Sequence, residues 1–343
     1  MTSRADIRHK AGRVKERLID QLLLLELRIP APRTRRPRIT RTSTKLACID
    51  HSFHEKTSSS AFFVEYLRQH FDVEVIADRT WSGVPLPDLS FLDDRYLGVV
   101  FFQTQPTRDL VDTIPNKNVI FVPMYDSAAK YGYRYWRQFS TLRMINFSST
   151  LHDRLLNWGF ESMYIQYFPK PLQFTGGSAN EVFYWQRVAR VNPAVVAKLF
   201  TGEPVKIHIH RSMDPHEPRA ELSSDDEARF GVTYSTWFDT KEAMLDLVRQ
   251  KGIYVAPREY EGIGMSFLEA MAMGKAVVAV DNPTMNEYIV HMKTGYLFDL
   301  ERPEKIDLSE VREVQRNAYQ RVRDGHESWE SSKHRIVEFI RAG

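Results

Sequence analysis

Short apolar runs alternate with amphipathic segments along most of the chain, and this rhythm predicts an α/β protein. In the first half the runs that predict strands lie at 46–49, 73–77, 99–103, 119–124, 144–147 and 163–167. Segments with helical spacing lie between them, at 59–70, 107–113 and 151–158. Strands that are apolar on both faces and separated by helices are typical of a parallel sheet covered by helices on both sides.

The second half of the chain repeats this rhythm. Apolar runs predict five further strands, at 182–186, 205–210, 232–236, 252–256 and 276–280. The stretch 169–178 between the halves contains two prolines and two glycines, which marks a domain boundary. The tail from 308 to 342 has mostly helical spacing. We therefore expect domains at 46–170 and 171–305, followed by helices over 306–343.

Composition agrees with two globular domains. The chain has 343 residues, of which 43% are hydrophobic and 27% charged, so it is neither disordered nor too short for two cores. Cys48 is the only cysteine, which excludes an intramolecular disulfide and fits a reducing compartment. The sequence therefore predicts a cytoplasmic protein.

Residues 1–45 form a basic arm. They carry 13 Lys and Arg against 4 Asp and Glu, whereas residues 46–343 carry 34 against 40. A local basic segment on a near-neutral body argues against a general nucleic-acid surface. The longest apolar run here, 22–25, is too short to span a bilayer, and the acidic residues before it argue against a signal peptide.

The arm also has helical periodicity. Residues 5–29 predict an amphipathic helix because apolar side chains recur at helical spacing, at Ile7, Val14, Leu18, Leu22 and Leu25. A linker rich in proline and arginine follows. Residues 5–41 are suited to lie on an anionic membrane, at the inner face of the cell membrane, or to pack on the protein body or a partner subunit. Both locations stay open.

One segment carries more chemical information than the rest of the chain. Residues 261–274 stand between two predicted strands and contain two glutamates eight positions apart. Gly262 and Gly264 let a ligand approach the backbone, and the following helix start offers unpaired N–H groups that suit a diphosphate. Glu261 and Glu269 are suited to accept hydrogen bonds from sugar hydroxyls. The segment therefore predicts a pocket for a sugar nucleotide.

This segment resembles the E-x7-E signature of retaining glycosyltransferases with the GT-B fold, and most of all their family 4. The likeness continues in order through 275–279, 286–288 and 294–298. It implies two Rossmann-like domains facing across a cleft, with the donor on the second, the acceptor on the first, and the last helix crossing back to the first. It also implies that Glu261 contacts donor-sugar hydroxyls, Glu269 the ribose diol, and the backbone of Gly262, Ile263 and Gly264 the sugar and phosphates.

The same resemblance implies a basic pair that holds the diphosphate. Arg187 follows the first strand of the second domain and is the phosphate candidate, with a catalytic role in stabilising the leaving group. The second basic residue of the family, usually a lysine, is missing, because Asn192 occupies its place. Arg190 and Arg211 are possible replacements. Arg258, just before the signature, is a further donor-binding candidate.

Two aromatic residues stand where the family binds the nucleotide base. Trp237 and Phe238 follow the predicted strand 232–236. Stacking of Trp237 on the base and a contact within the core both remain open.

The acceptor side matches the family less closely. Residues 51–60 replace the usual glycine-rich loop with hydroxyls and imidazoles, among them His54. Gln103 stands where a histidine is often found. Asp126 is the best carboxylate near a strand end, and helix capping is its alternative role. These three residues are the acceptor-side candidates.

Other readings of these motifs fit less well. A dinucleotide fingerprint would need a third glycine at 267, where Phe267 stands. His208 and His210 share one face of a strand and can ligate zinc. No cysteine or third histidine lies nearby in sequence, and Asp214 could join them only through a bend, so a packed or pocket-lining role is favoured. No Asp-x-Asp stands in a suitable loop, and no Gly-x-Ser-x-Gly is present. We therefore expect no metal and no cofactor besides the co-substrate.

These expectations converge on one function. The chain is predicted to be a retaining, metal-independent glycosyltransferase that moves a hexosyl unit from a nucleoside diphosphate sugar to a glycan or lipid-linked glycan, as in surface polysaccharide assembly. A GT-B sugar-nucleotide epimerase and a non-catalytic sugar-nucleotide-binding subunit of a glycan assembly complex are the alternatives. The intact pair of glutamates favours catalysis.

Overall fold

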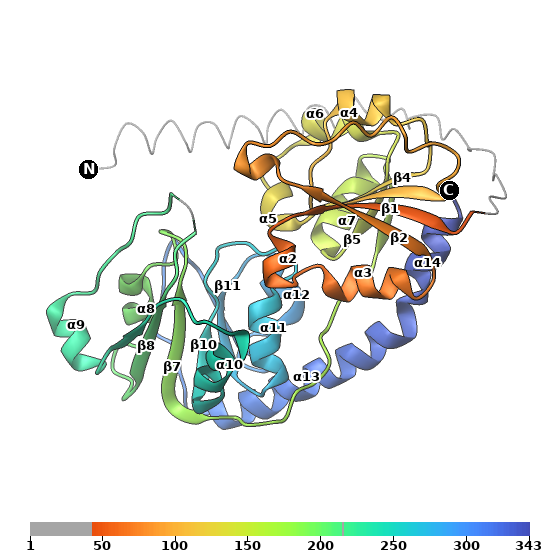
Figure 1. Ribbon diagram of the computed structural model, residues 1–343. Helices are drawn as coiled ribbons and strands as arrows, with labels where there is room; N and C mark the ends of the chain where they lie inside the picture. Colours follow the sequence, from red (N-terminus) through yellow and green to blue (C-terminus); the bar gives the residue numbers. More distant parts are fainter. Residues whose placement is uncertain (1–42, 215) are drawn as a thin grey trace. The chain divides into compact units, whose positions relative to one another are not determined.

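The computed structural model describes residues 43–214 and 216–343, which form two compact units (Figure 1). The first unit contains the described residues up to Ile165 together with Lys333–Gly343. The second unit contains Gln166–Ser332. The predicted helix at 5–29 and the basic linker lie outside the described residues.

The first unit is built on a parallel sheet of six strands in the order β2-β1-β3-β4-β5-β6. The strands are β1 (Lys45–His51), β2 (Asp72–Asp78), β3 (Gly98–Phe102), β4 (Val119–Val122), β5 (Arg143–Asn146) and β6 (Glu161–Tyr164). The helices are α2 (His54–Thr57), α3 (Ala61–Arg68), α4 (Arg108–Thr113), α5 (Tyr125–Ala128), α6 (Tyr133–Trp136), α7 (Ser149–Asn157) and α14 (His334–Arg341), with 3-10 turns η1 (Thr80–Ser82) and η2 (Arg137–Phe139).

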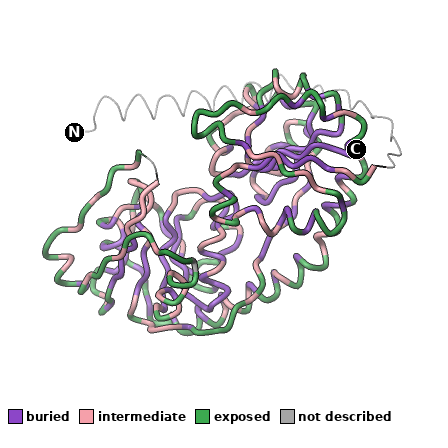
Figure 2. Tube along the Cα trace, viewed as in Figure 1, coloured by how far each residue is buried: buried purple, intermediate pink, exposed green. Residues whose placement is uncertain are grey.

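Aromatic side chains fill the core of this unit. Strands β3 and β4 are buried at every position, as their continuous apolar runs predict (Figure 2). Helix α3 packs on the sheet through Phe63, whose ring lies 5.0 Å from that of Phe102. Ser148 caps α7 by accepting a hydrogen bond from the Leu151 N–H at 3.2 Å.

The last helix of the chain belongs to the first unit. The Asn118 side-chain amide donates a hydrogen bond of 2.9 Å to the Ile340 carbonyl oxygen of α14. The Arg143 guanidinium lies 4.0 Å from the centre of the Phe339 ring. Ile336 and Ile340 are fully buried, so apolar burial and a buried amide contact together hold α14 on the sheet.

The second unit has its own parallel sheet, in the order β12-β11-β10-β7-β8-β9. The strands are β7 (Ser178–Gln186), β8 (Lys206–Arg211), β9 (Thr233–Ser235), β10 (Lys251–Val255), β11 (Ala276–Val280) and β12 (Tyr296–Phe298). The helices are α8 (Pro193–Leu199), α9 (Ser224–Arg229), α10 (Lys241–Gln250), α11 (Met265–Ala272), α12 (Met285–Tyr288) and α13 (Val311–Ser332). The chain runs outward in both directions from the β7/β10 pair, which makes this pair the topological switch point.

The two units confirm the predicted fold class, an α/β protein with two Rossmann-like domains. Several boundaries differ from the sequence-based expectation. The strand expected at 163–167 is β6, which begins at Glu161 because it pairs with Arg143 of β5, and which ends at Tyr164. The short strand β12 was not predicted, since its three residues gain their strand pairing only from β11.

Candidate functional site

The site begins with the loop between β10 and α11. Gly264 is the N-cap of α11 and has φ 85°, a left-handed conformation that glycine adopts without strain. A side-chain carbon at this position would lie 1.9 Å from the Phe267 ring, which is fully buried. Phe267 in turn packs edge-on against Tyr288, with ring centres 5.8 Å apart. The glycine therefore lets the loop run directly over a packed aromatic ring.

The same loop holds the first signature glutamate. Glu261 is 8% exposed, and Ile263 is also buried. The hydroxyl of buried Thr284 lies 3.4 Å from the carbonyl oxygens of both residues and donates to them from the loop after β11. Neighbouring strand ends thus fix the position of Glu261 before any ligand arrives.

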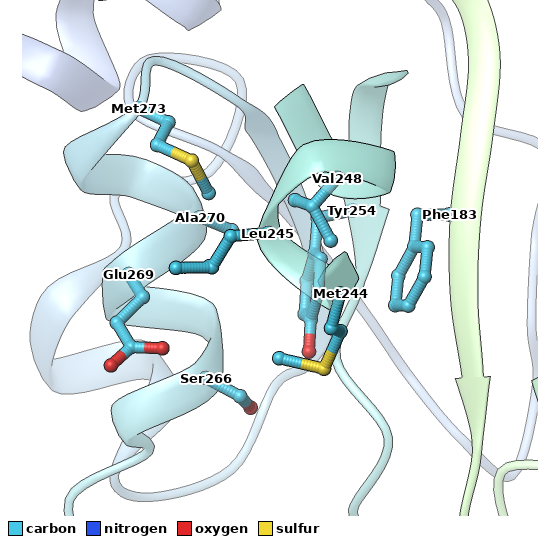
Figure 3. Close-up of a pocket in the computed structure, with 9 residues that line it drawn as sticks. All are labelled: Phe183, Met244, Leu245, Val248, Tyr254, Ser266, Glu269, Ala270 and Met273. Carbon is cyan, nitrogen blue, oxygen red and sulfur yellow. The ribbon is translucent and has the colours of Figure 1, made fainter. Parts of the chain in front are cut away.

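The second signature glutamate lies on α11 and lines a small pocket (Figure 3). Glu269 and Ser266 supply its polar side, and Tyr254 of β10 stands across from them. The remaining lining residues are apolar: Phe183, Met244, Leu245, Val248, Ala270 and Met273. Burial raises the pKa of Tyr254, and the charges of Glu261 and Glu269 raise it further, whereas the Ser266 hydrogen bond and Arg187 lower it. Tyr254 is therefore a neutral hydroxyl at neutral pH, within electrostatic reach of both glutamates and Arg187.

Two arginines meet at one aspartate. Arg187 follows β7 and places its Nε 2.7 Å from Asp214 Oδ1. Arg258 follows β10, and its Nη2 donates to Asp214 Oδ2. The Asp214 N–H also donates to the Arg187 carbonyl oxygen at 2.9 Å. Because β7 and β10 are adjacent, this cluster stands at the carboxyl edge of the sheet, at its switch point.

The other basic candidates have different partners. Arg190 pairs on the surface with Glu259, at 3.3 Å, and with Glu301. Arg211 pairs with Glu221 and lies over the Tyr234 ring. Of the basic residues that the sequence suggested for the diphosphate, the structure brings Arg187 and Arg258 together through Asp214.

Trp237 lies further along the same edge. It follows β9 and is 58% exposed. Strand β8 separates β9 from β7, so the end of β9 lies about 10 Å from the end of β7 at two strand spacings. Because its side chain is 58% exposed, Trp237 is not part of the hydrophobic core. Stacking on a base stays a prediction.

The histidine pair of β8 is part of a hydrogen-bonded core. The two ring nitrogens of His208 each lie 2.8 Å from a hydroxyl, of Thr233 and of Ser235, and His210 Nδ1 lies 3.0 Å from Ser235 Oγ. Burial lowers the pKa of both histidines to about 4. Within residues 43–214 and 216–343, no group of three or more His, Cys, Asp or Glu side chains is placed to hold a metal ion.

The acceptor-side candidates lie on three strand ends of the first unit. His54 is buried, with its Nδ1 2.6 Å from Asp50 Oδ1. Gln103 follows β3 with φ 60°, an uncommon backbone conformation for a residue other than glycine. Asp126 lies in the first turn of α5 and accepts the Ser127 N–H at 2.8 Å. The N-cap of α5 is Met124 and receives no side-chain hydrogen bond, so Asp126 is not the helix cap that was its alternative role.

Three residues of the site in the second unit were not among the site residues that the sequence predicted. The sequence suggests Asp214 only as a distant companion of the histidine pair, and it gives no signal for Tyr254 or Ser266. Asp214 follows β8 by three positions, so a carboxylate just after a predicted strand was the available signal. Its pairing with Arg187, 27 positions away, has no local signature.

Together these groups suit a diphosphate ester of a polyhydroxylated ligand. Arg187, Arg258 and the first N–H groups of α11 offer positive charge and donors at the switch point. Glu261 and Glu269 offer acceptors for hydroxyls. No described helix is both long enough and apolar enough to cross a lipid bilayer.

Comparison with known proteins agrees with this chemistry. Residues 231–310 match the family described as Glycosyl transferases group 1. The matched segment contains Glu261, Glu269 and the whole of α11. The match lies entirely within the second unit. A sequence comparison with curated proteins gives no significant match.

Solved structures show the same fold. The chain is similar to sucrose-phosphate synthase (tll1590) from Thermosynechococcus elongatus, with a TM-score of 0.59 and 12% identity over 87% of this chain and 98% of that one. It is similar to Anabaena Alr3699/HepE in complex with UDP and glucose, with a TM-score of 0.54 and 14% identity over 85% and 99%. It also matches TarM, with a TM-score of 0.51 and 16% identity over 71% of this chain, but spans only 54% of TarM. These neighbours confirm the GT-B architecture.

Proposed function

We propose that this protein is a retaining glycosyltransferase that transfers a hexosyl unit from a nucleoside diphosphate sugar to a hydroxyl of a glycan or lipid-linked glycan. The observation that carries the proposal is the convergence of Arg187, Arg258 and the start of α11 beside Glu261, at the β7/β10 switch point. Surface polysaccharide assembly, at the inner face of the membrane, is the setting that we propose for it.

The proposed mechanism rests on position and charge. Arg187 and Arg258 bind the diphosphate and stabilise the negative charge that develops on it as the bond to the sugar breaks. Glu261 orients the sugar through its hydroxyls, and Glu269 binds the ribose diol. The leaving diphosphate accepts the proton of the incoming hydroxyl on the same face of the sugar, so no protein nucleophile is required. The enzyme then acts mainly by holding the acceptor hydroxyl against the face of the sugar that the diphosphate leaves.

A second part of the proposal is metal independence. A divalent cation commonly neutralises a leaving diphosphate, and two guanidinium groups with helix N–H groups can supply the same stabilisation. Asp214 holds both guanidinium groups in place while the site is empty, which reduces the ordering that binding requires.

The test combines donor binding, donor hydrolysis and transfer. UDP-glucose is the first donor to try, because HepE was solved with UDP and glucose. Glu261→Ala should reduce turnover by about 100-fold, since a buried, charged hydrogen bond to the donor is lost. Glu269→Ala should mainly weaken nucleotide binding.

The matched control is Glu313→Ala, which removes an exposed glutamate in the first turn of α13. Near-wild-type transfer by both site variants would refute the assignment of the glutamates. Interconversion of the donor sugar without any acceptor would identify an epimerase instead.

A further inference from the structure

Exposed apolar side chains gather at one place on the first unit. Among its described residues, Phe53 and Trp81 are 39% and 58% exposed, and both lie on loops at the carboxyl ends of adjacent strands. Phe53 follows β1, and Trp81 lies in η1, just after β2. An exposed tryptophan beside an exposed phenylalanine keeps a large apolar area in contact with water. Such patches commonly mark binding sites.

These rings are held rigidly although they are exposed. The Trp81 indole N–H donates to Ser52 Oγ at 2.8 Å. The indole stacks on His51 with ring centres 5.8 Å apart, and Phe53 meets it edge-on at 5.9 Å. Buried Asp78 accepts the Thr80 N–H at 2.9 Å and fixes the turn that carries the tryptophan. We call Trp81, Phe53 and His51 the aromatic platform.

The platform rests on a buried polar network. Asp50 lies between His54 Nδ1, at 2.6 Å, and the Ser60 hydroxyl, which donates to it at 2.5 Å. These contacts tie α2 and the start of α3 to the end of β1. Burial, and then the neighbouring His54, lower the pKa of His51. The imidazole of the platform is therefore uncharged at neutral pH.

The platform stands at the ligand edge of its sheet. Chain direction reverses between β1 and β3, so the switch point of this unit lies at the end of β1. At the end of β3, the hydroxyl of Thr104 is buried and has no hydrogen-bond partner among the described residues. A buried hydroxyl without a partner is uncommon.

We propose that the aromatic platform stacks against a pyranose ring and so forms the binding subsite for a saccharide acceptor. This inference rests on the proposed function and assigns its acceptor to named residues. A hexopyranose has a face of C–H groups and a rim of hydroxyls. The indole and phenyl rings match the C–H face, while Ser52 and His51 offer polar groups to the rim.

Two control substitutions separate ring stacking at the platform from the general loss of an exposed aromatic side chain. Phe91 is 39% exposed, the same fraction as Phe53. Its ring lies 6.1 Å from that of Tyr96, which Lys45 contacts at the opposite end of β1. Phe91→Ala therefore removes an equally exposed ring far from the platform. Trp81→Phe keeps a ring at the platform and reports whether stacking survives.

The experiment is ligand-observed saturation-transfer NMR on the full chain, with UDP present and methyl glycosides of glucose, galactose, mannose and N-acetylglucosamine as probes. We expect at least one glycoside to bind and to receive saturation mainly at C–H groups of one ring face. Trp81→Ala and Phe53→Ala should weaken binding by about tenfold, the loss of one ring-stacking contact. Trp81→Phe should bind with intermediate affinity, and Phe91→Ala should bind like the wild type.

Several outcomes would overturn the inference. One is that no glycoside binds, and another is that Trp81→Ala and Phe53→Ala bind as well as Phe91→Ala does. A third is that glycerol 3-phosphate displaces the bound glycoside more strongly than a second glycoside does. Thermal shift with a panel of nucleoside diphosphate sugars, UDP-glucose among them, reports the donor site separately. Glycoside binding without a shift by any of them would uphold the platform and refute the proposed donor site. A shift without glycoside binding would uphold the donor site and refute the platform.

Discussion

Gly264→Ala tests how the signature loop is built. The substitution adds one methyl group at the N-cap of α11, where φ is 85°. It creates two separate problems: a left-handed backbone for a residue with a side chain, and a carbon 1.9 Å from Phe267 Cε1. Because Phe267 is fully buried, its ring cannot move without disturbing its contact with Tyr288. The loop or the first turn of α11 has to shift instead.

The size of the effect follows from these two contributions. A left-handed backbone costs a non-glycine residue about 1–2 kcal/mol. Overpacking of a filled core adds about 1–3 kcal/mol. In a unit of this size, 1 kcal/mol lowers Tm by roughly 2–4 °C, so we expect a fall of about 10 °C. The displaced N–H groups of α11 should also weaken UDP binding by at least about tenfold.

Gly159→Ala is the matched control. Gly159 has φ 83°, close to that of Gly264, but nothing lies within 4 Å of an added side-chain carbon. It should lower Tm by only about 4 °C, from the backbone contribution alone. Phe267→Leu in the Gly264→Ala background should recover part of the loss. Equal melting temperatures for the two alanine variants, with unchanged UDP affinity, would refute this account of the loop.

Four further predictions concern charge and location. Arg187→Ala should reduce kcat/KM by about 100-fold through lost stabilisation of the leaving diphosphate, whereas exposed Arg302→Ala should leave steady-state rates unchanged. Transfer should persist in EDTA, and loss of activity that manganese or magnesium restores would contradict metal independence. The pKa of His208 and His210 is lowered to about 4 from about 6.5 in the unfolded chain, so the unfolded state binds more protons between these values. The free energy of unfolding in urea should therefore fall as the pH drops from 6.5 to 4, with a shallower fall in His208→Gln. The full chain should sediment with anionic liposomes and a shortened chain starting at Leu46 should not; equal behaviour of the two would exclude a membrane role for residues 5–41.

The pattern of apolar and polar residues predicts most of the strands of the two sheets, but it predicts less well where each strand begins and ends. The run at 276–280 is β11 with the same limits, because five consecutive apolar residues leave no other element open. Strand β7 begins at Ser178, before its apolar run, since its pairing with Lys251 extends it through polar residues. Residues 178–181 have no such run of their own, so their strand pairing was not predictable locally.

The candidate site likewise has residues that the sequence predicts and contacts that it does not. Glu261, Gly264 and Glu269 were predictable because their spacing is set by one loop and one helix. The Asp214 contacts with Arg187 and Arg258 join three loops that follow three different strands. Their meeting depends on strand order, which the sequence pattern alone does not determine. The aromatic platform was missed for a similar reason, since Phe53 and Trp81 come together only because β1 and β2 are neighbours.

The position of α14 has a consequence for how the chain is made. The first unit is completed by residues 333–343, which leave the ribosome after the whole of the second unit. The second unit, 166–332, is fully synthesised before them. During translation the binding surface for α14 around Asn118 and Arg143 therefore stays uncovered until residues 333–343 have been made. A stop codon directly before the codon of Lys333 would thus damage the amino-terminal unit and leave the second unit complete.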